Sequence, residues 1–300
     1  MTPSQAPSDK QPQDTASQST PEILRRLASA FVLAVIALGA VIASPWSFLV
    51  LVLVASGLLA WEWGQLTRGN GFDATALVNA VSVMAIAVFV ALQRPDLAIL
   101  ILGATGMVLL FSNPDRKQGV WALAGLIYIA LPASAVVWLR SDPTYGLMVI
   151  LYLLAIAWTT DTASYFGGRG FGGAKLAPRI SPKKTWSGFI VGVLTATVLG
   201  YAFALYLGGT SPWLLALVSL GLAFACQVGD LLESAAKRHF GVKDMSQLIP
   251  GHGGLFDRID SLLLAAVVAA LIALRNPAAP GAGGRVIRTA RIFWRAPGGN

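Results

Sequence analysis

The sequence is poor in the residues that disulfide bonds, zinc sites and soluble surfaces require. Cys226 is the single cysteine, so no disulfide can form within the chain. With only two histidines, His239 and His252, the usual nitrogen and sulfur ligands of a zinc site are also in short supply. Charged residues make up only 12% of the 300 residues, which is far below the usage of soluble globular proteins. The composition therefore excludes an ordinary soluble domain.

Most of the chain consists of long hydrophobic runs. Hydrophobic residues form 55% of the chain, and the mean hydropathy is +0.67. A helix needs roughly 20 apolar residues to cross a bilayer, and about nine runs approach that length. They lie near 27–44, 47–66, 76–93, 97–112, 119–139, 144–160, 186–207, 212–229 and 259–275. We expect an all-α polytopic membrane protein of about nine transmembrane helices with a polar cavity facing the cytoplasm.

Both ends of the chain differ from this hydrophobic middle. Residues 1–22 are rich in Pro, Ser, Gln and Thr, a composition that predicts a disordered N-terminal tail. Residues 23–275 are expected to form the transmembrane domain. Residues 276–300 carry several arginines and are expected to form a basic, flexible C-terminal tail.

The distribution of basic residues predicts the orientation. Two segments, 161–185 and 230–258, hold most of the Lys and Arg between the runs. The loops expected on the opposite side of the membrane hold only Arg94 and Arg140. The positive-inside rule places the two basic segments in the cytoplasm. With nine spans the tail 276–300 would then lie outside, which disagrees with its own charge.

Carboxylates flank the last two apolar runs in pairs. Asp257 and Asp260 stand one helical turn apart at the start of the final run, and Asp230 and Glu233 have the same spacing after the preceding one. Acids at membrane boundaries are costly and usually carry chemistry or ions. Because Lys and Arg lie among them, this surface could hold a divalent cation through oxygen ligands and phosphates through its bases.

The segment 161–185 is rich in glycine and in bases. Its backbone could approach a polyphosphate while its bases neutralise the charge. It is not a Walker A loop, since Ala174 precedes Lys175 and no Ser or Thr follows. On composition alone, a solvated basic loop touching lipid headgroups is the competing interpretation.

The segment from Ser234 to Asp260 resembles the signature of the phosphatidate cytidylyltransferases, also called CDP-diacylglycerol synthases. The matching residues are Ser234, Lys237, Arg238, Lys243, Asp244, Pro250, His252, Gly253, Gly254, Asp257, Arg258 and Asp260. A second region is similar to the same family through Asp161, Tyr165, Gly168, Arg169, Lys175, Leu176, Ser181, Pro182, Lys183, Lys184 and Thr185. The family usually has Glu where this chain has Ser187.

The resemblance implies an enzyme that transfers a cytidylyl group from CTP to phosphatidate, with Mg²⁺ as cofactor. The catalytic residues it implies are Asp230, Asp257, Asp260, Lys237, Arg238 and His252, with Asp230 and Asp257 as metal ligands. The substrate-binding residues it implies are Asp161, Arg169, Lys175, Ser181, Lys183, Lys184, Thr185, Ser234, Lys243, Asp244, Gly253, Gly254 and Arg258. Its partners would be CTP, phosphatidate and bilayer lipid but no nucleic acid, and a homodimer is left open. We expect a multi-pass protein of the bacterial plasma (inner) membrane.

Several of these residues have simpler interpretations. Glu233 and Lys237 are spaced i to i+4 and could form a surface ion pair. Asp260 could cap the final helix. Glu62, an acid within the second run, resembles a Glu that the family often carries and could be structural, paired with a base.

Other functions remain as alternatives. A CTP-dependent lipid kinase, of the polyprenol or phytol kinase type, would use the γ-phosphate of the nucleotide. An ion-coupled transporter is disfavoured because the polar groups gather near the ends of the runs, and no internal repeat is evident. A CDP-alcohol phosphotransferase is disfavoured because its Asp-Gly-x-x-Ala-Arg pattern is absent from the sequence.

Overall fold

The protein is a bundle of helices with one short hairpin. The computed structural model describes residues 32, 34–113, 115–208, 211–248 and 253–275, so both predicted tails lie outside the described residues. The elements are α2 (Pro45–Arg68), α3 (Ala74–Ala91), α4 (Pro95–Ser112), α5 (Arg116–Arg140), α6 (Gly146–Phe171), β1 (Lys175–Ala177), β2 (Ser181–Thr185), α7 (Trp186–Leu207), α8 (Pro212–His239) and α9 (Phe256–Leu274). A shorter apolar helix, Ala34–Ala43, precedes them.

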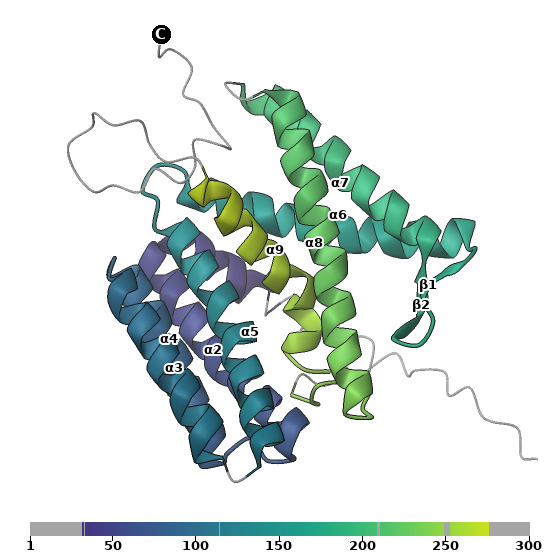
Figure 1. Ribbon diagram of the computed structural model, residues 1–300. Helices are drawn as coiled ribbons and strands as arrows, with labels where there is room; N and C mark the ends of the chain where they lie inside the picture. The colour runs from purple at the N-terminus through teal and green to yellow at the C-terminus, as the bar shows by residue number, and fades with distance from the viewer. Residues whose placement is uncertain (1–31, 33, 114, 209–210, 249–252, 276–300) are drawn as a thin grey trace, which may run out of the picture.

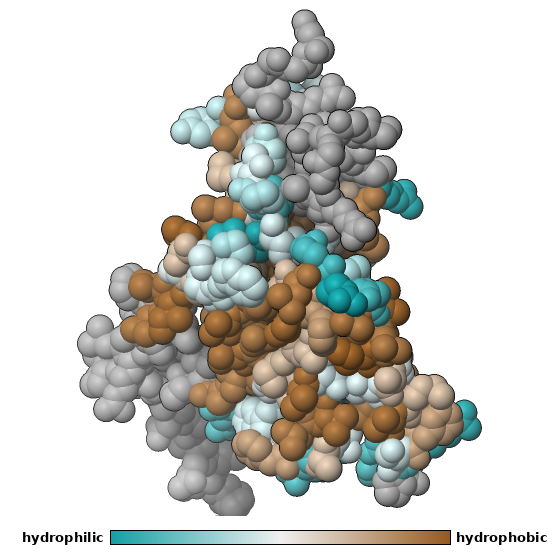
Figure 2. Space-filling view, turned by 90° about the vertical axis from the view of Figure 1, so that its left-hand side faces the viewer, coloured by the Kyte–Doolittle hydropathy of each residue, from teal (hydrophilic) through white to brown (hydrophobic). Residues whose placement is uncertain are grey.

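Each of the nine apolar runs coincides with one of the described helices, which confirms an all-α membrane fold. Among the described residues, the seven helices α2 to α8 are long and apolar enough to cross a membrane. Figure 2 looks at the molecule from the side of α3 and α4 and shows a broad hydrophobic surface. Large apolar side chains of α3 and α4 are exposed, including Leu77, Ile99 and Phe111. Such a surface suits lipid tails, and the chain is a multi-pass membrane protein.

Small polar residues and prolines fix where the helices begin. Pro45, Pro95 and Pro212 each occupy the first positions of a helix, where the missing N–H costs nothing. Ser44 caps α2, because its Oγ accepts a hydrogen bond from the Ser47 N–H at 3.0 Å. Gly69 ends α2 with a φ of 71°, a conformation that favours glycine.

The helices form two groups joined by α9. Helices α2 to α5 pack together, α6 to α8 pack together, and α9 contacts α5, α6 and α8. Figure 1 shows α9 between the two groups. The N-terminal end of α9, which carries Asp257 and Asp260, is therefore held by helices from both halves of the chain.

The turns predicted to share one side of the membrane lie together at one end of the molecule. Thr75 Oγ1 donates to Asn113 Oδ1 at 3.2 Å, which joins the turn before α3 to the turn before α5. The rings of Trp121 and His239 lie 4.9 Å apart and join α5 to the end of α8. Arg238 Nε donates to the Ile180 carbonyl at 3.3 Å and joins α8 to the hairpin. The two basic segments thus meet at the same end.

The glycine-rich loop predicted over 161–185 is wrong in its first half. Helix α6 continues to Phe171, and close contacts at Gly167 of α6 and Gly188 of α7 pack the two helices together. A Cβ on Gly167 would lie 2.6 Å from Val191 Cβ, and one on Gly188 would lie 2.6 Å from the Ser164 carbonyl oxygen. The second half forms the antiparallel hairpin of β1 and β2.

The loop predicted over 230–258 is wrong in the same way. Helix α8 continues ten residues past the predicted end of its apolar run, from 229 to His239. Its six polar residues after Gly229 therefore lie on a continuous helix, in positions set by the helical period. They are Asp230, Glu233, Ser234, Lys237, Arg238 and His239.

Candidate active site

Three helices converge where the acids gather. Gly229 of α8 packs against α9, since a Cβ on it would lie 2.7 Å from the carbonyl oxygen of Asp260. Ser261 Oγ donates to Asp161 Oδ2 at 2.9 Å and joins α9 to α6. The glycine permits a backbone approach that any larger residue would prevent. Asp161, Asp230 and Asp260 come from three different helices and are brought together by this packing.

Asp230 is paired with a base of the hairpin. Lys184 Nζ lies 2.5 Å from Asp230 Oδ2, with the two side chains 20% and 30% exposed. Ser234 Oγ donates to Asp230 Oδ1 at 3.4 Å. An ion pair this shielded is screened less by solvent than a surface pair. The hairpin is thus fixed over α8 by an acid and a base that the sequence placed in separate regions.

Asp257 lies in a second, more buried group. Lys237 Nζ lies 2.6 Å from Asp257 Oδ1 and 2.7 Å from Glu233 Oε2. Asp257 Oδ2 accepts from the N–H groups of Met245 and Gly254 at 3.1 and 2.8 Å. The Glu233–Lys237 pair predicted from spacing is present, but Glu233 is 0% exposed, so the surface location was wrong. Both oxygens of Asp257 are already engaged within the protein.

Asp260 does not cap α9. It lies in the second turn of that helix, and its Oδ1 accepts from the neighbouring Ser261 N–H at 2.7 Å. The first N–H groups of the helix are satisfied instead by Glu62, described below. Asp260 is close enough to Asp230 and Asp161 for the three negative charges to interact. The hypothesis of a capping role for Asp260 is therefore wrong.

A polar cavity of about 600 Å³ lies between α6, the hairpin, α7 and α8. This volume falls within the range of small-molecule sites. Seven of the predicted site residues line it, namely Asp161, Arg169, Lys175, Lys183, Lys184, Thr185 and Asp230. The cavity therefore places four basic side chains and the carboxylates of Asp161 and Asp230 around one space.

An apolar cavity of about 280 Å³ adjoins it. Helices α2, α5, α6 and α9 line most of it, and its polar residues include Asp161, Arg258 and Ser261. Asp161 lines both cavities. An apolar space and a charged space thus meet at one carboxylate.

The remaining predicted residues lie around these cavities or outside the described residues. Ser234 and Gly253 are half-buried, and Gly254 is buried. Arg238, Lys243 and Asp244 are exposed, and Ser181 is half-buried at the start of β2. His252 lies outside the described residues. Ser187, where the family has Glu, donates from its Oγ to the Gly172 carbonyl and ties α7 to the end of α6.

Sequence reasoning missed three polar residues of the site. Gln227 and Ser164 line the polar cavity, and Gln227 Nε2 donates to Ser164 Oγ at 2.5 Å. Gln227 could have been identified, because it is an amide within an apolar run. It is buried and lies three residues before Asp230, hence on the same helix face. Ser261 was also missed, because nothing in its own segment points to Asp161.

The chemistry of these side chains fits a magnesium ion. In the described part of the chain, no group of three His, Cys, Asp or Glu side chains is placed to hold an ion without other ligands. Mg²⁺ is commonly bound by one or two carboxylates together with substrate phosphates. Asp230 lines the basic cavity and is close to Asp260, which matches that pattern. Pairing Asp230 with Asp257 stays a prediction.

Comparisons with known proteins identify the family of this chain. Residues 24–274 match the model of the cytidylyltransferase family. The chain is 37% identical to a phosphatidate cytidylyltransferase of Brucella suis over 216 residues, which cover 72% of this chain and 80% of that one. It is 36% identical over 223 residues to one from Haemophilus influenzae, covering 70% and 74% of the two chains. It is also 37% identical over 207 residues to one from Bacillus subtilis, covering 69% and 72%.

Proposed function

Because this chain belongs to the cytidylyltransferase family and transfers a cytidylyl group from CTP to phosphatidate, we propose that the reaction takes place in the polar cavity beside Asp230. The products are CDP-diacylglycerol and pyrophosphate, so the protein is a nucleotidyltransferase of phospholipid biosynthesis. The observation that carries the proposal is the cavity itself, which gathers bases from three elements around a shielded acid.

The reaction requires charge neutralisation and alignment more than covalent help from the protein. A phosphate oxygen of phosphatidate forms a bond to the α-phosphorus of CTP, and the bond from that phosphorus to the oxygen bridging to the β-phosphate breaks. The electron pair leaves with pyrophosphate. Lys175, Lys183 and Arg169 line the cavity and would neutralise the phosphates of both substrates. Lys184 is held by Asp230 and would be positioned for the same task.

Asp230 and Asp260 would hold the magnesium ion, with CTP phosphate oxygens completing its coordination. The ion would offset negative charge that develops on the leaving pyrophosphate. Lys237, bound to Asp257 and Glu233, would fix the start of α9 against α8. In this arrangement Asp257 contributes by orienting α9, since its oxygens are engaged by Lys237 and by two backbone N–H groups.

The two adjoining cavities suit a lipid substrate. Phosphatidate carries its reactive phosphate on an apolar body that stays in the bilayer. The apolar cavity between α2, α5, α6 and α9 would receive part of that body, and the polar cavity would receive CTP. The phosphate would lie at their junction near Asp161, with Arg258 at the edge of the apolar cavity.

CTP labelled in its α-phosphate tests the reaction against a CTP-dependent lipid kinase. The purified protein is incubated with phosphatidate, Mg²⁺ and CTP labelled in either the α- or the γ-phosphate. We expect the α-label in the lipid fraction and the γ-label in pyrophosphate. A γ-label in the lipid fraction would contradict cytidylyl transfer and indicate kinase activity.

Replacing Lys183 and Lys184 together by Gln is expected to lower kcat/KM for CTP by about thirtyfold. The loss of two charge-assisted phosphate contacts is worth on the order of 2 kcal/mol. Kinetics of the double variant in purified form check this. The control is a double Gln variant of Arg116 and Lys117, two adjacent bases at the same end of the molecule but outside the polar cavity. Equal effects in both variants would contradict CTP binding by these two lysines and would indicate that the hairpin only contacts lipid headgroups.

The orientation and location follow as further proposals. The polar cavity would face the cytoplasm of a bacterium across its plasma (inner) membrane, because the basic turns share one end of the molecule. A homodimer stays an expectation.

Cysteine labelling tests this orientation. In a Cys226→Ser background, Ala174→Cys and Lys243→Cys should react with an impermeant thiol reagent only after the cells are permeabilised. Thr144→Cys, in the exposed turn between α5 and α6, should react in intact cells. Labelling of position 174 or 243 in intact cells would reverse the orientation.

A further inference from the structure

Glu62 ties the N-terminal half of the chain to the start of α9. It lies in α2, which carries none of the motif residues, and its side chain is 0% exposed. Its Oε1 accepts from Ser246 Oγ at 2.5 Å and from the Leu255 N–H at 2.8 Å. Its Oε2 accepts from the Phe256 N–H at 2.9 Å. The Glu62 side chain thus accepts three hydrogen bonds from the segment that leads into α9.

These contacts replace a helix cap. The first N–H groups of a helix have no acceptor within it, and Leu255 at the cap position offers no side-chain acceptor. Glu62 supplies the acceptors from another helix, and a carboxylate is favourable at the positive end of a helix dipole. The expected pairing of Glu62 with a base is wrong, because among the described residues no Lys or Arg nitrogen forms an ion pair with it.

The approach of α2 to this segment is close enough to require glycine. A Cβ on Gly254 would lie 2.4 Å from Glu62 Oε1 and 3.0 Å from Ser246 Oγ. A methyl group at this position would therefore push the carboxylate away from its partners. The backbone of the segment is shaped around Glu62.

The neighbouring Trp63 also contacts the start of α9. Its Nε1 donates to the Trp121 carbonyl at 2.8 Å, and its ring lies 6.0 Å from that of Phe256. A Cβ on Gly125 would lie 2.3 Å from the Trp63 ring. Helix α2 is therefore locked to α5 and to the start of α9 by adjacent residues.

We propose that Glu62 is a positioning residue that sets the start of α9 so that Asp257 meets Lys237 and Asp260 faces Asp230. The Gly254 N–H donates to Asp257 Oδ2, while the next two N–H groups donate to Glu62. Consecutive backbone groups thus connect Glu62 to the acids of α9. This inference rests on the proposed roles of the α9 acids.

Two substitutions at Glu62 and one at Gly254 test the role. Glu62→Gln keeps an oxygen acceptor, whereas Glu62→Ala removes every acceptor. We expect Glu62→Ala to lower kcat at least thirtyfold with KM for CTP changed less than threefold, because the hairpin bases stay in place. Glu62→Gln should stay within fivefold of wild type. Gly254→Ala, which displaces the carboxylate without removing it, should also lower kcat at least tenfold.

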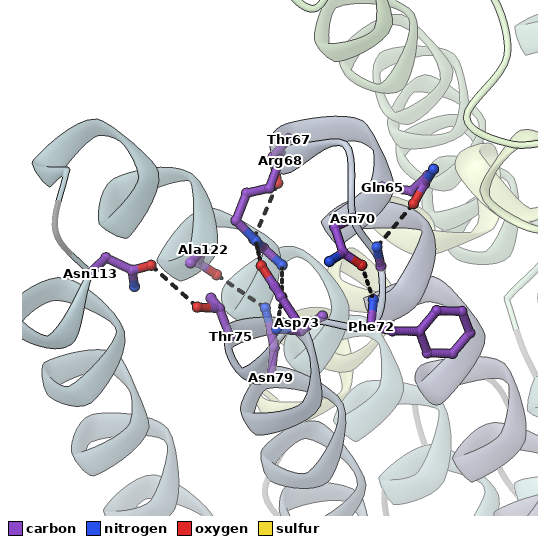
Figure 3. Close-up of polar contacts among 12 residues, drawn as sticks. Gln65, Thr67, Arg68, Asn70, Phe72, Asp73, Thr75, Asn79, Asn113 and Ala122 are labelled. Atoms are coloured by element: carbon purple, nitrogen blue, oxygen red, sulfur yellow. Dashed lines mark hydrogen bonds and ion pairs between the residues drawn. The ribbon is translucent and has the colours of Figure 1, made fainter.

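Asp73 provides a matched control, because it is another acid that caps a helix from a partly buried position. It accepts from the Ala76 N–H at 2.7 Å and from Arg68 Nε and Nη2 at 2.5 and 3.0 Å (Figure 3). Burial acts to raise the pKa of Asp73, but hydrogen bonds from Arg68 and Ala76 hold that pKa below its ordinary value, so Asp73 is a charged cap. Asp73→Ala should lower the unfolding temperature and leave kcat within threefold of wild type.

The readouts separate a positioning role from a loss of folding. Unfolding temperature and hydrogen exchange of the amides of Leu255 and Phe256 are measured for each variant, and Mn²⁺ binding is followed by its electron paramagnetic resonance signal. Glu62→Ala should show faster exchange at these two amides and weaker Mn²⁺ binding, while Asp73→Ala should show neither. The inference is overturned if Glu62→Ala keeps more than a third of wild-type kcat, or if Gln and Ala at Glu62 behave alike.

Failure of this inference is distinguishable from failure of the proposed site. An inactive Asp230→Asn variant beside an active Glu62→Ala variant would reject only the positioning role. An active Asp230→Asn variant would reject the site on which that role depends.

Discussion

Asp230→Asn is expected to lower turnover at least about a hundredfold, which corresponds to about 2.7 kcal/mol of barrier. Asn keeps the size of the side chain but removes the charge that pairs with Lys184 at 2.5 Å and that would hold magnesium near the triphosphate. The measurement is CDP-diacylglycerol formation at matched membrane levels over a range of Mg²⁺ concentrations. Partial recovery at high Mg²⁺ would indicate a weakened site that still forms.

The control for this variant is Asp96→Asn. Asp96, in the first turn of α4, forms an exposed pair with Arg94 at 2.9 Å, at the end of the helix assigned to the opposite side of the membrane. It should leave turnover unchanged, because exposed pairs contribute little. An Asp230→Asn enzyme with more than a tenth of wild-type turnover would contradict the role of Asp230.

Asp260→Asn and Asp257→Asn are expected to differ in how far they lower turnover and in whether they change its dependence on Mg²⁺. Asp260→Asn should lower turnover at least about a hundredfold, with partial recovery at high Mg²⁺, because it removes charge beside Asp230. Asp257→Asn should lower turnover by about tenfold, since it weakens the contact to Lys237. Its dependence on Mg²⁺ should match that of the wild type.

The opposite order would support the metal pair predicted from the sequence. If Asp257 and not Asp260 binds the ion, Asp257→Asn should show the larger loss and the shifted Mg²⁺ dependence. Kinetics of both variants at several Mg²⁺ concentrations distinguish the two assignments. Equal and Mg²⁺-independent losses in both variants would contradict either one.

The sequence predicted the membrane helices well because the bilayer imposes their length. Each apolar run must satisfy its backbone hydrogen bonds internally, so an apolar run of this length indicates a helix without reference to the rest of the chain. The ends of α6 and α8 were missed for a related reason. Polarity at Asp161 and Asp230 suggested the end of a span, but the helix continues ten residues beyond Asp161, to Phe171, and nine beyond Asp230, to His239. Polarity marks the membrane boundary, which need not be the end of a helix.

The site was only partly predictable because its contacts join distant segments. Spacing on one helix correctly indicated the Glu233–Lys237 pair. Spacing could not indicate that Lys237 also binds Asp257, or that Glu62 caps a helix that begins 194 residues later at Phe256. Gly254 was predicted to bind substrate, but its close neighbour in space is Glu62 of α2. Such contacts follow from packing between helices.

Direct metal binding tests the central claim, which is that Asp230 and Asp260 hold the divalent ion together with CTP. Purified wild-type, Asp260→Asn and Asp257→Asn proteins are titrated with Mn²⁺ in the presence of CTP and without phosphatidate, and bound Mn²⁺ is followed by electron paramagnetic resonance. We expect Asp260→Asn to weaken Mn²⁺ binding at least tenfold and Asp257→Asn to stay within threefold of wild type. Unchanged binding by Asp260→Asn together with a large loss in Asp257→Asn would contradict the assignment of Asp260 as a metal ligand.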